Sequence, residues 1–119
     1  MKQFFGMSQS GDLQEAVRGV SNPQLIMLFS NGDQFEEHVK KLEALFPNIP
    51  SIGCIGMSYD TRVVEKGVGV LAFSDGVSVA VNVLEQASTM PVKYIERLEK
   101  DVSEINASQK DTICIDLCS

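Results

Sequence analysis

The chain has 119 residues, enough for one domain with a real hydrophobic core but few for a complete α/β enzyme. Apolar residues make up 44% and charged residues 22%, ordinary globular values that exclude a disordered, collagen-like or coiled-coil chain. The net charge of −6 argues against nucleic acid as a partner, because no cluster of Lys or Arg is present to neutralise phosphates.

Three features of the sequence bear on the compartment. No apolar run approaches the ~20 residues of a membrane helix, so we expect no membrane contact by this segment. The N-terminus carries one positive charge and no sustained apolar core, unlike a signal peptide. The three cysteines are an odd number scattered through apolar segments, which does not suggest a disulfide framework. We therefore expect a cytoplasmic protein.

The chain opens with a short predicted strand over residues 3–8. A helix follows from Asp12 to Val20, where Asp12 and Glu15 have the spacing of a capping box. Pro23 ends that helix region, because proline has no N–H to donate and clashes with the preceding turn.

The next segment predicts a βαβ unit. Residues 25–29 are an unbroken apolar run, typical of a strand inside the sheet. Asp33 and Glu36 repeat the capping-box spacing and predict a helix up to Pro47. Its expected buried stripe comprises Phe35, Val39, Leu42, Leu45 and Phe46. A second internal strand is expected over 51–55.

The remaining chain predicts one hairpin, one helix and one strand. Residues 68–73 and the alternating valines of 77–83 flank a Ser-Asp-Gly turn, which predicts an antiparallel hairpin over about 68–84. A helix with an apolar stripe, expected to pack on the sheet, starts near Pro91, and a strand is expected over 112–118. The prediction is a single α/β domain over 1–119 with three helices and a mixed sheet of about five or six strands.

A candidate ligand site follows from this topology, because ligands of open α/β sheets collect beyond the carboxyl ends of parallel strands. Two such ends carry polar or glycine-rich loops. Arg62 is suited to hold a carboxylate, Asp60 an amine, and Tyr59 to wall the pocket. The alternative is an ordinary solvated loop. The candidate residues are Ser30, Asn31, Gly32, Gly53, Cys54, Ser58, Tyr59, Asp60 and Arg62.

Catalytic and metal chemistry have weaker support in the sequence. Cys54 needs a base to become a nucleophile, and the only histidine, His38, falls among charged residues of the preceding predicted helix. That setting predicts a solvated imidazole rather than a ligand to metal or haem. No zinc-ligand spacing, dinucleotide fingerprint or phosphate loop is present. We expect no catalysis and no resident cofactor.

The order of these segments resembles the N-terminal part of the FIST domain of bacterial signalling proteins. The likeness rests on the opening strand with 12–20, the strand 25–30, the helix ending at Phe46-Pro47, the loop Ile52-Gly53-Cys54 and the segment 67–73. In that family the Gly-Cys loop usually continues with small hydroxyl residues, a glycine and an acid, whereas Ile55-Gly56-Met57-Ser58-Tyr59 follows here.

The resemblance implies the first part of a longer sensory domain that binds small ligands such as amino acids. FIST domains are usually joined to kinase, chemoreceptor or cyclic-dinucleotide output domains, and some members bind haem and sense nitric oxide. We therefore predict a sensory input module for a small-molecule ligand. The alternatives are a thiol-dependent enzyme using Cys54, or a self-association module forming a homodimer, with haem bound through His38 as a further ligand mode.

Overall fold

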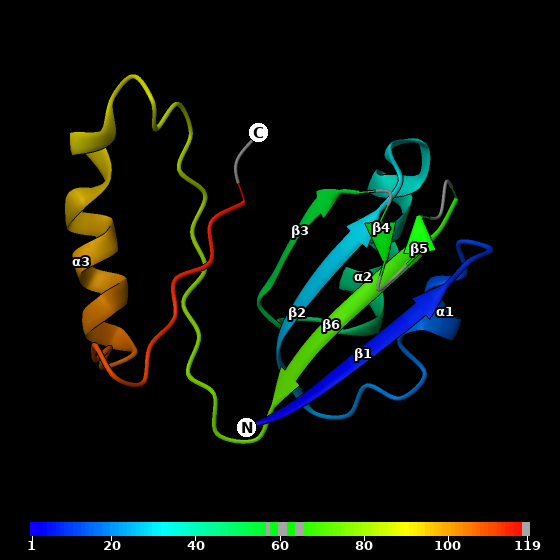
Figure 1. The fold of residues 1–119 in the computed structure, drawn as a ribbon. Coiled ribbons are helices and arrows are strands. Elements are labelled where there is room, and N and C mark those ends of the chain that lie inside the picture. The colour runs from blue at the N-terminus through cyan, green and yellow to red at the C-terminus, as the bar shows by residue number, and fades with distance from the viewer. Residues whose placement is uncertain (57, 60–61, 64–65, 118–119) are drawn as a thin grey trace. The chain divides into compact units, whose positions relative to one another are not determined.

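The computed structural model describes residues 1–56, 58–59, 62–63 and 66–117. Within that part of the chain, four strands form a mixed sheet (Figure 1). In spatial order they are β1 (Lys2–Ser8), β6 (Val68–Ser74), β2 (Pro23–Ser30) and β3 (Ser51–Ile55). A separate antiparallel pair comprises β4 (Ser58–Tyr59) and β5 (Arg62–Val63).

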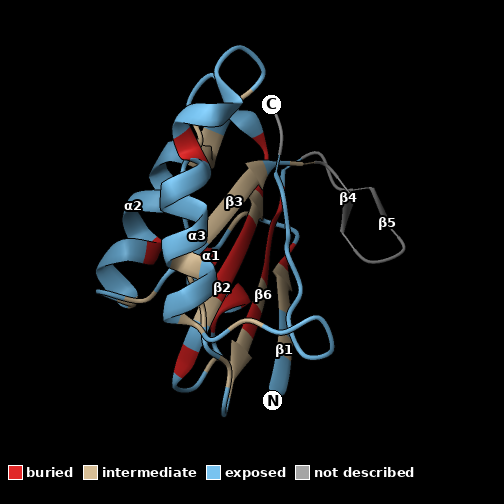
Figure 2. Cartoon of the chain, turned by 90° about the vertical axis from the view of Figure 1, so that its left-hand side faces the viewer, coloured by how far each residue is buried: buried red, intermediate tan, exposed pale blue. Residues whose placement is uncertain are grey.

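The predicted βαβ core is confirmed, except that β3 lies at the edge of the described sheet and is not the second internal strand that was predicted. β2 and β3 pair in parallel, and α2 (Phe35–Leu45) lies between them in the chain after a 3₁₀ turn, η1 (Gly32–Gln34). β2 has neighbours on both sides, as its unbroken apolar run predicts for an internal strand. Figure 2 shows that buried residues are concentrated on β2 and β6, the two central strands of the sheet.

One face of the sheet is covered by two helices and forms the core. α1 (Leu13–Ala16) is shorter than predicted, although its start is confirmed, since the Asp12 carboxylate caps it by accepting from the Gln14 N–H. α1 and α2 lie on the same side of the sheet (Figure 1). The buried core cluster joins them to the strands through Leu13, Ala16, Val17, Ile26, Leu28, Leu42, Val68, Val70 and Ala72.

The predicted phase of α2 is wrong. Its buried residues are His38 and Leu42, whereas Val39 and Leu45 are exposed. The helix is therefore turned so that position 38 rather than 39 faces the core, with Phe35 and Phe46 packed beside it. The capping box at Asp33 is also wrong, because that residue lies inside η1 and α2 begins without a side-chain cap.

The predicted hairpin over 68–84 is wrong as well. β6 pairs antiparallel with β1 on one side and with β2 on the other, so its backbone groups are already used along both sides. Residues 77–83 consequently have no position beside it and form no strand. The sheet has four strands in the described part of the chain, fewer than the predicted five or six.

The chain divides into two compact units, 1–77 and 78–119. The second contains η2 (Pro91–Tyr94) and α3 (Ile95–Glu104), where the Arg97 guanidinium lies 5.3 Å from the centre of the buried Tyr94 ring. None of the residues of α3 is buried, and its predicted packing on the sheet stays a prediction. Residues 112–117 form no strand, although one was predicted over 112–118.

No helix in the part of the chain that the structure describes has the length and apolar character needed to cross a membrane.

Candidate functional site at the carboxyl end of the sheet

Three strands of the sheet end at the same place. Ser8 of β1 and Ser30 of β2 both pair with Val68, the first residue of β6, and Ile55 of β3 pairs with Ser30. The Gly56 N–H then donates to the Ser30 carbonyl at 2.8 Å, so the chain leaves β3 beside β2. We call this place the carboxyl end of the sheet. It is where the fold class predicts a ligand.

A buried histidine lies at this end. His38 of α2 is 1% exposed, and its Nε2 lies 2.9 Å from the Gly11 carbonyl oxygen. Because a carbonyl only accepts, Nε2 carries a hydrogen. Its Nδ1 lies 2.6 Å from the Ser30 hydroxyl oxygen. One imidazole therefore links the helix, the end of β2 and the loop that follows β1.

The Ser30 hydroxyl can hydrogen-bond to the His38 ring whether the imidazole is neutral or protonated. Toward a neutral imidazole it donates to Nδ1, and toward an imidazolium it accepts and donates instead to the Asn31 carbonyl at 3.2 Å. The buried hydrogen bonds are thus satisfied in both cases. This explains how a polar ring is tolerated in the core without a charged partner.

Glycine is favoured at residue 11 for two reasons. Its φ of +80° is in the left-handed region that glycine adopts without strain. A Cβ at this position would also lie 2.7 Å from the Gln34 side-chain oxygen. Glycine at residue 11 therefore lets the loop bring its carbonyl to His38 without backbone strain and without displacing Gln34.

Ser8 organises the neighbouring strand end. Its hydroxyl donates to the Glu15 carboxylate at 2.7 Å and accepts from the Asp12 N–H at 3.0 Å. The Ser10 hydroxyl lies 3.1 Å away. Since its hydrogen-bonding capacity is used by its own loop and α1, Ser8 holds the fold together rather than offering a group to a ligand.

Asn31 differs from its neighbours. It is 7% exposed, and its side-chain oxygen Oδ1 is buried without a hydrogen-bond partner among the described residues. Leaving such an acceptor unpaired costs about 1–3 kcal/mol. Asn31 follows directly after Ser30 and precedes the uncapped start of η1. Within the described part of the chain, its Oδ1 is the buried side-chain acceptor at this end that lacks a donor.

The structure brings together only some of the predicted site residues. Ser30, Asn31 and Gly32 lie at the carboxyl end of the sheet, the first two buried and Gly32 exposed. Ser58 and Tyr59 form β4 and Arg62 belongs to β5, with Tyr59 opposite Arg62, but their side-chain positions fall outside the described structure. Asp60 lies outside the described residues.

Gly53 and Cys54 lie inside β3 rather than in the loop beyond it. Gly53 pairs with Leu28, and a Cβ on it would lie 2.6 Å from the Leu28 carbonyl oxygen. Cys54 pairs with Phe29. Because side chains alternate along a strand, Cys54 projects to the face opposite Leu28 and Ser30. His38, which lies on the Ser30 face with both ring nitrogens occupied, is therefore not positioned as its base.

Sequence reasoning missed His38 and Gly11 as site residues. The prediction of a solvated imidazole at His38 is wrong, since the ring is buried. Phe35, His38 and Leu42 are spaced i, i+3, i+7, which is the signal that would have found it. Among the described residues, no three His, Cys, Asp or Glu side chains group closely enough to hold a metal ion.

A family model, the FIST N domain, matches residues 24–117, which is most of the chain. The chain belongs to the FIST N domain family. The resemblance inferred from the sequence is thereby confirmed, and a FIST domain is a sensory module of signal transduction. Neither the curated proteins nor the solved structures gave a match. β1, Gly11 and α1 precede the matched range, yet in this chain β1 completes the four-stranded sheet and Gly11 accepts from the buried His38.

Proposed function

We propose that this FIST N domain binds a small ligand that donates hydrogen bonds, such as the ammonium group of an amino acid, at the carboxyl end of the sheet. The observation that carries the proposal is Oδ1 of Asn31, a buried acceptor without a donor among the described residues. A ligand N–H at this atom would remove the cost of the unpaired acceptor.

The charges near Asn31 favour a positively charged ligand group. Asp33 lies in η1, and Glu36 and Glu37 lie in the first turn of α2. Glu37 is paired with Lys41, so Asp33 and Glu36 are the carboxylates of this segment that would attract an ammonium group and repel an anion. The carboxylate of an amino acid would then need a cation, and Arg62 is the residue that the sequence predicts for this role.

We further propose that the module acts without catalysis, in the cytoplasm, and passes its signal to an output domain of the full-length protein. Support comes from the geometry of Cys54, which projects away from His38. Haem is a poor fit to His38, because the ring is 1% exposed and axial ligation would break its hydrogen bond to Ser30 or to Gly11. We therefore propose no resident cofactor.

A thermal-shift screen with the standard amino acids and small amines tests the proposal. A ligand at a hundred times its dissociation constant should raise the free energy of unfolding by about 2.7 kcal/mol. The Asn31→Leu variant should retain the melting temperature of the free protein and lose affinity by about tenfold or more. Asn82→Leu is the matched control, since Asn82 is exposed in the second unit and bonds to Asp101.

Two outcomes would contradict this function. One is the absence of any shift across the whole screen in the wild-type protein. The other is a ligand whose affinity is the same for the wild type and Asn31→Leu, which would place its site elsewhere.

Self-association is a second candidate function, favoured by the exposed apolar side chains of the second unit. α3 exposes Ile95, Leu98 and Val102, and Val83 is 71% exposed. Such a stripe is typical of a helix that is buried against a partner. Sedimentation of the wild type and of Leu98→Glu should show a dimer that the substitution dissociates, and a wild-type monomer at high concentration would exclude this candidate.

A further inference from the structure

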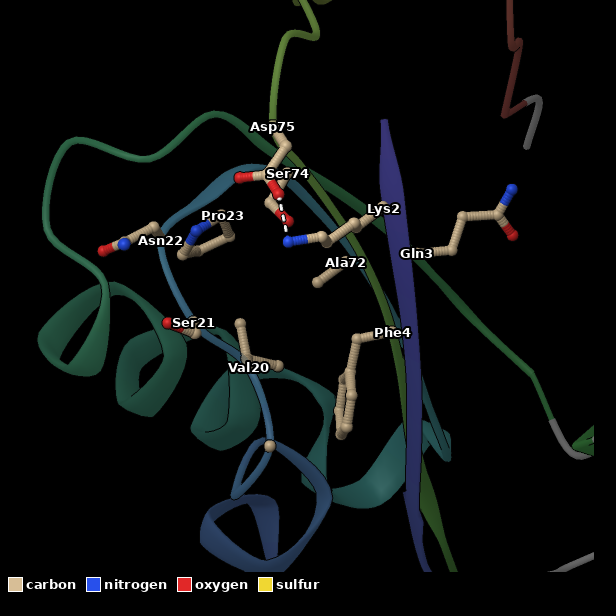
Figure 3. A pocket seen from close by; sticks show the side chains of 11 residues that line it. Lys2, Gln3, Phe4, Val20, Ser21, Asn22, Pro23, Ala72, Ser74 and Asp75 are labelled. Atoms are coloured by element: carbon tan, nitrogen blue, oxygen red, sulfur yellow. Dashed lines mark ion pairs between the residues drawn. The ribbon is translucent and has the colours of Figure 1, made fainter.

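The face of the sheet that is turned away from α1 and α2 is apolar. Successive side chains along a strand point to opposite faces. Figure 3 shows this on β1, at the end of the sheet opposite the candidate site: Phe4 points toward Val20 into a cavity of ≈ 320 Å³, and Gln3 points away. We call the surface on the Gln3 side the far face. Its apolar members come from all four strands and are Phe5, Met7, Leu25, Met27, Phe29, Ile52, Cys54, Leu71 and Phe73.

The far face has the composition of a buried surface. Among the strand residues that point to it, Gln3 is polar and none is charged. Both α-helices of residues 1–77 lie on the other side of the sheet (Figure 1). Met27 is buried, yet Phe5 is 48% exposed and the remaining apolar members are half-buried. A sheet face in contact with water alternates apolar and polar residues, so a face this apolar indicates that another element packs on it.

The helix α3 carries an apolar surface that is likewise exposed. Ile95, Leu98 and Val102 are spaced i, i+3 and i+7, which places them on one side of the helix, and their exposed fractions are 49%, 42% and 54%. A helix of ten residues gains most of its stability from packing such a stripe. Within one described chain the stripe remains exposed, so the surface that covers it belongs to another molecule.

We propose that the far face of one copy of this chain receives α3 of a second copy. Apolar sheet faces and amphipathic helices are the surfaces that pack against each other in α/β proteins. The contact buries no charge, because neither the far face nor the stripe contains a charged residue. In a two-fold dimer each copy receives the other's α3, so both far faces and both stripes are covered.

This inference rests on self-association, the second candidate function above, and adds the surface on which α3 docks. Pairing of α3 with the α3 of another copy is the alternative contact. That pairing would leave both far faces exposed, and isolated helices of ten residues are marginal in water. Docking on the sheet covers both kinds of exposed surface in one contact, which is why we favour it.

Sedimentation of the full chain over a range of concentrations tests the contact from both sides. Leu98→Glu puts a charge into the stripe, and Phe5→Glu puts one onto an exposed position of the far face. Each should raise the dimer dissociation constant by about tenfold or more, because the new charge is buried without a partner. Val39→Glu is the matched control, since Val39 is an apolar residue of α2 that is 41% exposed, and it should leave the dimer intact.

Labelling of the native thiols with a bulky maleimide gives a second readout that needs no substitution in the sheet. Cys54 points to the far face and is half-buried, whereas Cys114 is exposed in the second unit and serves as the internal reference. The dimer should protect Cys54 relative to Cys114. Either dilution of the wild type or Leu98→Glu should remove that protection, and peptide mapping by mass spectrometry assigns each thiol.

Three results would overturn the docking site. A dimer that Leu98→Glu dissociates while Phe5→Glu does not, with Cys54 equally reactive in both states, would leave self-association standing and place α3 elsewhere. Protection of Cys54 that persists on dilution would mean that its cover comes from the same chain. A wild-type monomer at every concentration would remove the docking site together with self-association.

Discussion

The two ends of the sheet differ in whether their polar side chains are buried or exposed. At the carboxyl end, Ser8, Ser30 and His38 are buried, and short hydrogen bonds join Ser30 to His38 and Ser8 to Glu15. At the opposite end, Lys2 and Asp75 form an exposed ion pair over an open cavity. Buried polar groups are costly to disconnect, whereas exposed pairs contribute little. For substitutions at the carboxyl end, a loss of function must therefore be distinguished from a loss of folding. For substitutions at the opposite end, this distinction is hardly needed.

The largest effect is expected from His38→Ala. The substitution leaves the Ser30 hydroxyl and the Gly11 carbonyl without their partner and removes a buried ring, which should cost about 2–4 kcal/mol. Urea denaturation gives the free energy of unfolding. Lys40→Ala, an exposed neighbour on α2, should change it by less than about 0.5 kcal/mol. A loss of under about 1 kcal/mol for His38→Ala would mean that the network is not structural.

Gly53→Ala should destabilise the sheet by a smaller amount. The new Cβ would lie 2.6 Å from the Leu28 carbonyl oxygen, so β2 and β3 must move apart, at a cost of about 1–3 kcal/mol. Gly56→Ala is the control, because a Cβ there meets no atom of the described structure within 4 Å. Equal melting temperatures for the two variants would refute the close approach of the strands.

Asn31→Leu should be close to neutral in the ligand-free protein. The substitution removes an acceptor that has no donor among the residues the structure describes, so the free energy of unfolding should change by less than about 1 kcal/mol or rise. Ser30→Ala, one residue earlier, should cost about 1–3 kcal/mol because it leaves a His38 nitrogen unpaired. Similar losses for both variants would show that Oδ1 of Asn31 has a structural partner.

The smallest effect is expected at the opposite end and depends on pH. The pKa of Asp75 is lowered from 3.8, so its stabilising contribution is complete above that value and is lost as the pH falls through the lower folded-state pKa. The pKa of Lys2 is raised from 10.5, so its contribution is complete below that value and is lost as the pH rises through the higher one.

The difference in melting temperature between wild type and Lys2→Ala should therefore be small, present at neutral pH, and absent at both extremes. A difference that persists at strongly acid pH would have another cause than this ion pair. Melting temperatures of Lys41→Ala over the same pH range provide a comparison, because this substitution removes a second exposed ion pair, Lys41–Glu37.

The fold was predictable where the signal is local. The apolar run 25–29 and the change to helical spacing after it identify the βαβ core, and Asp12 marks the start of α1. The hairpin was not predictable in the same way. The alternation of apolar residues in 77–83 suggests a strand with one buried face, but it does not show which other strand would pair with it. β6 pairs instead with β1, which is distant in sequence and competes for the same backbone groups.

The candidate site, too, was predictable only where the signal is local. Ser30 and Asn31 follow from the rule that ligands meet strand ends, which needs only the positions of the strands. The burial of His38 depends on Gly11, which is 27 residues away in the chain and meets the ring only after folding. The helical spacing is equally compatible with Val39 or His38 on the buried face. Because valine is the more hydrophobic residue, the sequence favoured Val39. The roles predicted for Tyr59, Asp60 and Arg62 remain predictions, since the described structure does not include their side chains.

The position of β1 has a practical consequence for the choice of boundaries in a recombinant fragment of this domain. A recombinant fragment trimmed to residues 24–117, the span of the family match, would lack β1 and α1. β6 would then become an outer strand with a free row of backbone donors and acceptors, which invites intermolecular pairing and precipitation. His38 would also lose its acceptor at Gly11. For expression and crystallisation, the workable N-terminal boundary is therefore at or before Lys2.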